Sequence, residues 1–208
     1  MVSAREALDR LREGNRRFVA ERGGEMSTGG TRRRALVGGQ APFAIVLGCS
    51  DSRVPAEIVF DQGLGDLFVI RVAGNVVAPS QVGSVEFAAE RFGTRLVVVL
   101  GHSLCGAVQA TLEELQRPSA VRSRNLSSIV DRIRPAVEPL LETGAHAPPQ
   151  SLLATAVRAN IRASCNHLRH GSQIIEQLIQ TEGLLVVGAE YSLESGLVDF
   201  FDVPEIER

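Results

Sequence analysis

Two short stretches of the sequence carry the side chains best suited to chemistry. Residues 49–53 read CSDSR and residues 101–106 read GHSLCG. Cys49, His102 and Cys105 together offer two thiolates and one imidazole, a soft ligand set suited to zinc. Three protein ligands leave the fourth tetrahedral position open, which is typical of a catalytic zinc site rather than a structural one.

Each of these residues has a plainer interpretation when taken alone. A single cysteine is more often a small buried hydrophobe than a ligand. Asp51 could cap a turn, Arg53 could be a solvated surface charge, and His102 could be a hydrogen-bonded loop residue. The joint pattern favours zinc, because a Cys follows one predicted strand, His-x-x-Cys follows another, and no fourth Cys or His lies nearby in the sequence.

Both stretches come directly after apolar runs that we predict to be buried strands. Phe43–Leu47 precedes Cys49, and Leu96–Leu100 precedes His102. The second run is apolar throughout, which is typical of a strand covered on both faces. Ligands gather beyond the carboxyl ends of strands in an open parallel sheet, so we expect the two loops to meet there.

The rest of the chain alternates between predicted strands and helices. Further strands are predicted at 67–71 and 184–188, with an edge strand near 197–200, and helices at 3–19, 55–60, 82–92, 107–115, 126–141, 152–168 and 172–181. This pattern predicts an α/β fold, with a mostly parallel central β-sheet flanked by helices and an N-terminal helical arm. We expect a single domain over residues 1–208, in which 1–40 form the arm and connector and 41–208 the core, with a helical insertion at about 124–169.

Composition excludes several classes of partner. The 208 residues are 44% hydrophobic and 22% charged, as in ordinary globular proteins. A net charge of −2 gives no electrostatic footprint for nucleic acid or an anionic membrane. The first six residues hold no apolar signal-peptide core, and no run approaches the ~20 apolar residues of a membrane span. A soluble cytoplasmic protein is therefore expected. Three cysteines form no even disulfide framework, so in a reducing compartment we expect them to be ligands, nucleophiles or core residues.

The remaining cysteine and histidines are assigned no chemical role. Cys165, His167 and His170 lie inside a predicted helix, where packing and surface exposure explain them. His146 lies in a proline-rich break between two helices that matches no motif. No proton shuttle is therefore evident among these histidines.

The two chemical stretches resemble the metal-binding motifs of the β-class carbonic anhydrases. Supporting similarities are residues 68–71 (FVIR), 73–75 (AGN) and 84–87 (SVEF), the amphipathic N-terminal helix, and residues 187–188 before Tyr191. The resemblance covers nearly the whole chain. It implies Zn²⁺ held by Cys49, His102 and Cys105, and the reversible hydration of carbon dioxide to bicarbonate and a proton.

The resemblance also implies roles for Asp51 and Arg53. As an acceptor, Asp51 orients the zinc hydroxide towards the carbon of CO₂, and Arg53 holds that carboxylate in a forked, charge-assisted pair. In some members the equivalent Asp becomes a fourth zinc ligand in a closed, inactive state. Members with a bicarbonate-regulated closed state carry Trp three residues before the first Cys, where this sequence has Val46. We therefore predict a plant-like, open site at neutral to alkaline pH.

Four further residues are assigned to the substrate by resemblance. Gln40 matches the residue that donates a hydrogen bond to substrate in plant-type members. Phe68 and Phe87 wall a narrow apolar pocket, although plain core packing is the alternative for both. In this family such walls, with the Gln, often come from the other subunit, so we expect a homodimer or a dimer of dimers. Gly106 could let a backbone amide approach the substrate oxygen.

Two thiolate ligands predict a particular pH dependence. They would cancel the double charge of the metal, whereas three neutral histidines lower the pKa of zinc-bound water to about 7. We therefore expect a weaker acid and CO₂ hydration that rises towards alkaline pH, measured by stopped flow. A profile flat from mildly acidic pH upwards would contradict this expectation.

Three alternatives remain open. A carbonyl sulfide or carbon disulfide hydrolase would use the same zinc site, and comparing CO₂ hydration with sulfide release separates the two. A non-catalytic zinc-binding relative would be expected to have lost Asp51 or Arg53, and both are present. A nucleotide-binding protein is remote, because no Gly-x-Gly-x-x-Gly or Walker pattern follows any predicted strand.

Overall fold

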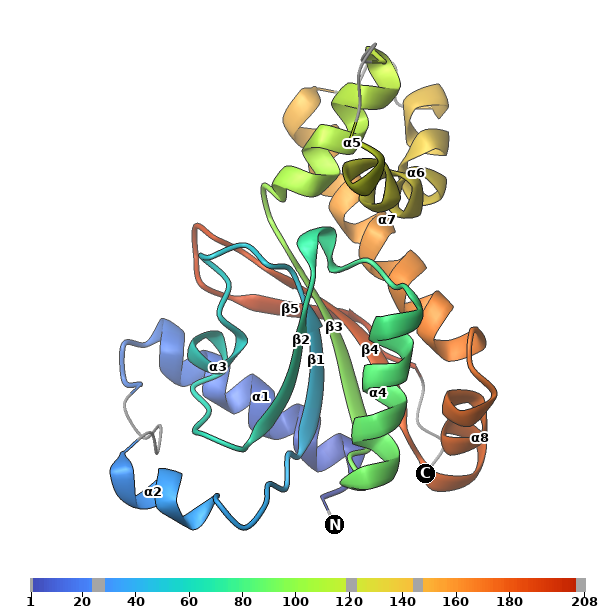
Figure 1. Ribbon diagram of the computed structural model, residues 1–208. Helices are drawn as coiled ribbons and strands as arrows, with labels where there is room; N and C mark the ends of the chain where they lie inside the picture. The colour runs from blue at the N-terminus through green and yellow to red at the C-terminus, as the bar shows by residue number, and fades with distance from the viewer. Residues whose placement is uncertain (1, 24–28, 119–122, 144–147, 205–208) are drawn as a thin grey trace.

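Five strands form a central sheet in the order β2-β1-β3-β4-β5 (Figure 1). The computed structural model describes residues 2–23, 29–118, 123–143 and 148–204. The strands are β1 Ala44–Gly48, β2 Leu67–Arg71, β3 Leu96–His102, β4 Leu185–Tyr191 and β5 Val198–Asp202. The helices are α1 Ala4–Val19, α2 Gly30–Ala35, α3 Ala56–Val59, α4 Pro79–Arg91, α5 Gly106–Gln116, α6 Arg124–Thr143, α7 Pro149–His170 and α8 Gln173–Glu182, with a 3₁₀ turn, η1, at Ala73–Asn75. All strand pairs are parallel except β4 with β5, which confirms the predicted fold class.

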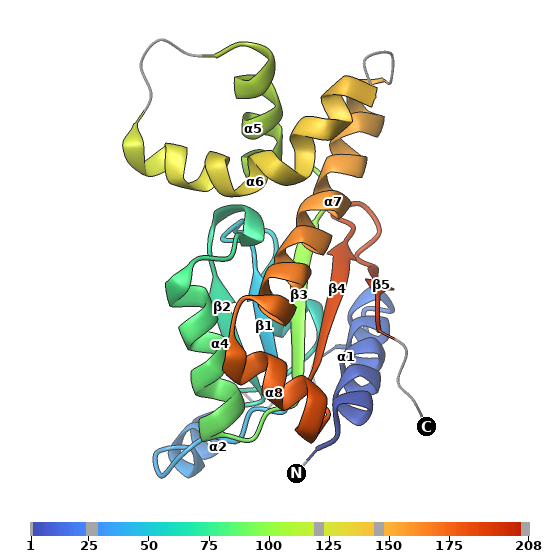
Figure 2. The ribbon, with the colours of Figure 1, turned by 90° about the vertical axis from the view of Figure 1, so that its right-hand side faces the viewer.

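Helices cover both faces of the sheet, and alternate residues of each strand face opposite layers. In β1, Ile45 and Leu47 pack in the core with α4, α7 and α8. Ala44 and Val46 face the other core, which α1 and α3 complete. Figure 2 shows α4, α7 and α8 in front of the sheet and α1 behind it. Because neither face meets water, β1 and β3 are buried throughout, as their apolar runs predict.

Strand β2 pairs with one side of β1, and β3 pairs with its other side, so the order of the strands reverses after β2. From β1 the chain crosses through α3 to β2 at one edge, and from β2 it crosses through α4, on the opposite face, to β3. The connections that leave the carboxyl ends of β1 and β3 therefore run to opposite sides, and the point between them is a switch point, where open α/β sheets bind their ligands. Cys49 follows β1 directly and His102 ends β3, so the topology brings the two predicted ligands together.

The N-terminal helix begins where predicted, and the face predicted to be apolar is the one that is buried. The Ser3 side chain caps α1 by accepting a hydrogen bond from the Glu6 N–H at 3.2 Å. Leu8 and Leu11 are buried in the core on the α1 face of the sheet. The amphipathic pattern of this helix is therefore satisfied by its packing against the sheet.

Some boundaries differ from the sequence predictions for local reasons. Helix α4 starts at Pro79, three residues before the predicted start, because proline is favoured in the first turn, where no N–H is needed. Strand β3 continues to His102, which pairs with Tyr191 of β4. Helix α2 was not predicted and lies within the Gly-rich connector. Helix α7, in the segment predicted as an insertion, packs against β3 and β4. Among the described residues, no helix combines the length and the apolar composition that a membrane span requires.

Candidate metal centre

Cys49, His102 and Cys105 converge at the carboxyl edge of the sheet. Their ligand atoms, the two Sγ atoms and a ring nitrogen, all lie within 4.8 Å of one another, and all three residues are buried. In the described part of the chain this is the only such group of three or more His, Cys, Asp or Glu side chains. Three separate elements supply it: the end of β1, the end of β3, and the N-cap of α5.

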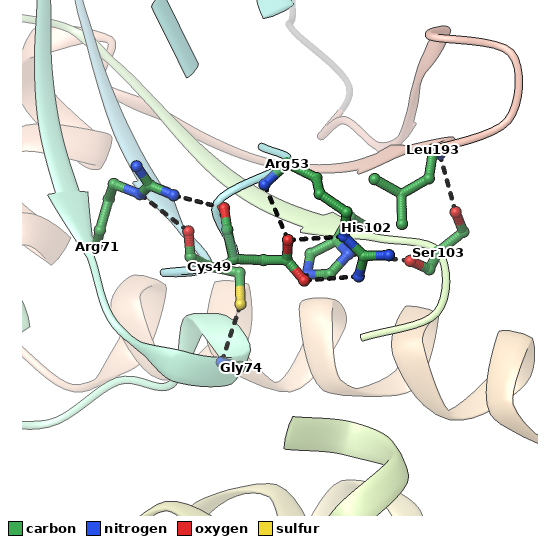
Figure 3. Close-up of polar contacts among 8 residues, drawn as sticks. Cys49, Arg53, Arg71, Gly74, His102, Ser103 and Leu193 are labelled. Carbon is green, nitrogen blue, oxygen red and sulfur yellow. Dashed lines mark hydrogen bonds and ion pairs between the residues drawn. The ribbon is translucent and has the colours of Figure 1, made fainter. Parts of the chain in front are cut away.

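The His102 ring is oriented with one nitrogen left for a ligand (Figure 3). Its Nδ1 lies 2.9 Å from the carbonyl oxygen of Ser103, to which it donates. Ser103 is itself fixed, because its N–H donates to the Tyr191 carbonyl at 2.9 Å and its Oγ accepts from the Leu193 N–H at 3.0 Å. The Nε2 atom is buried and has no hydrogen-bond partner among the described residues. Burying a polar atom unpaired is costly, and a metal ion bound to Nε2 would remove that cost.

The two cysteines are electrostatically linked. A hydrogen bond from the Cys105 thiol lowers the pKa of Cys49 to about 4, and the same contact raises the pKa of Cys105 well above its usual range. The backbone N–H of Gly74 also donates to Cys49 Sγ, at 3.3 Å. A cation bound by both sulfurs would require both as thiolates, so its binding would release protons held by the two cysteines.

Asp51 stands beside the ligand group as an ionised acceptor. Arg53 holds it in a fork, with Nε donating to Oδ1 at 2.9 Å and Nη2 to Oδ2 at 2.7 Å, while the Arg53 N–H donates to Oδ1 at 3.0 Å. These hydrogen bonds keep the pKa of Asp51 well below its usual range. Oδ2 lies 3.8 Å from His102 Nε2, so the carboxylate borders the space that faces the three ligands.

Arg71, which was assigned no role from the sequence, fixes the loop that carries Cys49 and Asp51. From the end of β2, its Nε donates to the Cys49 carbonyl at 3.1 Å and its Nη2 to the Asp51 carbonyl at 2.6 Å (Figure 3). In the sequence, Arg71 is a single charged residue at the end of an apolar predicted strand. Such a residue is ordinarily a surface charge, and only the parallel pairing of β1 with β2 places it beside the loop.

The structure does not bring Gln40 to the metal centre of its own chain. Gln40 is exposed and precedes β1, at the amino edge of the sheet, whereas Cys49 follows the other end of that strand. The five residues of β1 span about 16 Å. Within one chain, Gln40 therefore lies too far from Cys49 to contact a substrate bound there.

Phe68 and Phe87 lie together, nearer the amino edge of the sheet than Cys49. With Phe92 they form an aromatic cluster on the α4 face of the sheet, with ring centroids 5.7–6.2 Å apart. Phe68 pairs with Ile45, four residues before Cys49, which is about 13 Å along the strand. Phe87 is 54% exposed, so it is not plain core.

Gly106 is the first residue of α5, directly after Cys105, and it is exposed. A Cβ atom at this position would meet nothing within 4 Å. The described residues therefore leave open space beside it. Its N–H belongs to the first turn of the helix, whose donors have no partner within the helix.

Cys165 and its neighbouring histidines do not join the metal group. Cys165 is fully buried on α7, 3.3 Å from where a Cβ of Gly188 in β4 would stand, and burial raises its pKa to about 12. His167 and His170 are exposed in the last turn of α7. His146 lies outside the described residues.

A buried Cys-His-Cys set at the switch point of an open α/β sheet could hold a metal ion, and two sulfurs with one imidazole are a donor set that suits zinc. A family model described as carbonic anhydrase matches residues 44–198. The chain is 38% identical over 186 residues to carbonic anhydrase 2 of Mycobacterium tuberculosis, covering 89% of this chain and 87% of that protein. It is 39% identical over 189 residues to a carbonic anhydrase of Mycolicibacterium smegmatis, covering 91% and 89%.

Structural comparison agrees with the sequence comparisons. A β-carbonic anhydrase of Aspergillus fumigatus superposes with a TM-score of 0.74 at 26% identity, covering 84% of this chain and 82% of the fungal one. The chain belongs to the carbonic anhydrase family, in its β class, and is a carbonate dehydratase.

Proposed function

We propose that this chain catalyses the zinc-dependent, reversible hydration of carbon dioxide to bicarbonate and a proton, with Cys49, His102 and Cys105 as the zinc ligands. The buried, unpaired Nε2 of His102 within 4.8 Å of two cysteine sulfurs is the observation that supports this most strongly. When bound, zinc lowers the pKa of a water at its open position far below that of free water and so supplies a nucleophile.

Asp51 orients the attacking water in this proposal. An ionised carboxylate only accepts hydrogen bonds, so the water must point a proton at Asp51 and a lone pair towards the carbon of CO₂. Arg53 occupies both carboxylate oxygens and so resists rotation of Asp51 towards the ligands. Val46 is buried on the α1 face of β1 and offers no hydrogen-bond donor. We therefore propose the open arrangement, with Asp51 off the metal, at neutral to alkaline pH.

The substrate pocket is proposed to be completed by a second copy of the chain, in a homodimer or a dimer of dimers. Gln40 is too far from the metal centre of its own chain, and Phe87 is exposed on the helix that follows the edge strand β2. A neighbouring copy would present Gln40, Phe68 and Phe87 to the site without any change in this fold. The Gly106 N–H belongs to the first turn of α5, whose donors have no partner within the helix, and it is proposed to meet a substrate oxygen.

A mixed dimer tests whether Gln40 acts across the interface. Chains carrying Gln40→Leu and chains carrying Asp51→Asn, with different affinity tags, are co-expressed and the mixed species is isolated by tandem purification. If Gln40 serves the partner, each mixed dimer holds one intact site and one doubly altered site. Stopped-flow CO₂ hydration should then exceed that of either parent dimer. A rate between those of the two parents would show that Gln40 acts within its own chain or not at all.

Two coarser properties complete the proposal. All described strands belong to one sheet, which supports assigning residues 1–208 to a single β-carbonic anhydrase domain. None of the three cysteines forms a disulfide, as is typical of proteins in a reducing compartment, and we propose the cytoplasm.

Stopped-flow CO₂ hydration by the zinc-loaded protein tests the proposed reaction. Proton release should depend on zinc, disappear after chelation and return when zinc is restored. Sulfide release from carbonyl sulfide is measured on the same sample. A zinc-loaded protein that releases sulfide but does not hydrate CO₂ would overturn the proposal.

A further inference from the structure

The η1 turn has a backbone conformation that side chains rarely favour. Gly74 has φ 68° and Asn75 has φ 45°, so two consecutive residues occupy the left-handed region. The side-chain nitrogen of Asn75 is buried and has no hydrogen-bond partner among the described residues, so this atom does not anchor the turn. Backbone of this kind persists only where the surrounding structure determines it.

Two buried polar residues of α7 supply that constraint. Asn160 Nδ2 donates to the Gly74 carbonyl at 2.8 Å, and Ser164 Oγ donates to the Asn75 carbonyl at 3.0 Å. Asn160 and Ser164 are 2% and 5% exposed, and their four-residue spacing places them on one face of the helix. Both bonds therefore bind the same helix to the same turn, across 86 and 89 residues of sequence.

Close packing holds both α7 and the η1 turn in place. A Cβ at Gly101 of β3 would stand 2.5 Å from Ile161 Cδ1, so α7 lies against the strand that ends in His102. On another side, a Cβ at Gly74 would stand 2.8 Å from Ile133 Cδ1 of α6 and 3.1 Å from Ala107 Cβ of α5. The turn therefore has little room to move unless its bonds to α7 are lost.

The turn delivers one hydrogen bond to the metal centre, from the Gly74 N–H to Cys49 Sγ at 3.3 Å (Figure 3). We propose that Asn160 and Ser164 are positioning residues for the metal centre, which fix η1 so that Gly74 donates to the Cys49 thiolate. This inference rests on the proposed role of Cys49 as a zinc ligand. Neither α7 residue is within the metal group, so each acts through the turn.

The hydrogen bond has two consequences that can be measured. It draws electron density from the sulfur, so its loss makes the thiolate a stronger donor and lowers the energy of sulfur-to-metal charge transfer. It also holds the sulfur in place, and loss of a partner that orients a ligand typically weakens metal affinity 10–100-fold. If Asn160 and Ser164 had a purely structural role, replacing them would lower the free energy of unfolding without moving the charge-transfer band.

Ser164→Ala and Asn160→Ala are the variants that test the proposal. Zinc affinity is measured by competition with a chromogenic chelator, and the near-ultraviolet charge-transfer band is recorded on the Co²⁺-substituted protein. Each variant is expected to bind zinc 10–100-fold more weakly and to shift the band to longer wavelength. Ser164→Thr, which keeps the hydroxyl, should leave zinc affinity and the position of the band as in the unaltered protein.

Cys165→Ala is the matched control. It truncates a buried side chain of the same helix that faces β4 instead of η1. It should lower the free energy of unfolding while leaving zinc affinity and the cobalt band as in the unaltered protein. If the Cys165 variant moves the band as far as the Ser164 variant does, the effect is general loosening of α7 and the proposal is wrong.

If neither variant folds, a measurement on the unaltered protein still tests the hydrogen bond from Gly74 to Cys49 on which the proposal rests. In the ¹¹³Cd-substituted protein, the Gly74 amide proton should show scalar coupling to cadmium through the sulfur, and absence of that coupling would overturn the proposal. The two levels of inference fail differently. An unaltered protein that binds no zinc defeats the proposed function, whereas normal zinc binding with unchanged variants defeats only the positioning role.

Discussion

Asp51→Asn is expected to slow CO₂ hydration by about 100-fold or more while zinc remains bound, because the substitution removes orientation of the nucleophile. The amide matches the carboxylate in size but replaces one acceptor oxygen with a donor. It therefore loses one arm of the Arg53 fork and can turn a donor towards the attacking water. Stopped-flow kinetics and zinc content, measured on one preparation, separate the two effects.

Ser52→Ala is the matched control for this substitution. Ser52 lies between the two residues of the pair and is exposed, so its truncation should leave both the rate and the zinc content unchanged. An Asp51→Asn protein that hydrates CO₂ at the unaltered rate would show that Asp51 does not orient the nucleophile. Loss of zinc from that variant would instead show that Asp51 supports the metal directly.

Cys105→Ser is expected to remove zinc and reduce CO₂ hydration to the uncatalysed rate. Serine nearly matches cysteine in volume, but its hydroxyl does not ionise near neutral pH and is a hard donor, poorly suited to a soft thiolate position. Because Cys105 lies at the N-cap of α5, where serine is favoured, the fold should survive the change. Circular dichroism, zinc content after dialysis and stopped-flow kinetics check the three parts.

Cys165→Ser provides the comparison for that result. It makes the same chemical change at a buried cysteine outside the metal group, at a cost of about 1–3 kcal/mol if the new hydroxyl finds no partner. Zinc and activity should be retained. If both serine variants lose zinc equally, the loss reflects destabilisation and not a missing ligand.

The sequence predicted the fold class and the convergence of Cys49, His102 and Cys105 for one physical reason. Strands covered on both faces must be apolar throughout, so β1 and β3 stand out as uninterrupted runs, and the polar residues after them mark the carboxyl edge. The spacing of the two motifs then needed only parallel pairing of these strands to bring Cys49 near His102.

What the sequence did not indicate depends on contacts between distant elements. Arg71 resembles an ordinary terminal charge until β2 pairs with β1. Asn160 and Ser164 lie on a helix whose periodicity shows only that it is amphipathic, and their partners are backbone carbonyls, which leave no mark on the sequence. The position of Gln40 shows the reverse case: a residue assigned to the substrate by resemblance lies beyond the far end of β1 in its own chain.

Zinc K-edge X-ray absorption on the purified, unaltered protein tests the central claim most directly. The account predicts two sulfur ligands at about 2.3 Å and two nitrogen or oxygen ligands at about 2.0–2.2 Å, from Cys49, Cys105, His102 and one water. A zinc ion with no sulfur ligand, or a folded, metal-free protein that still hydrates CO₂, would contradict it.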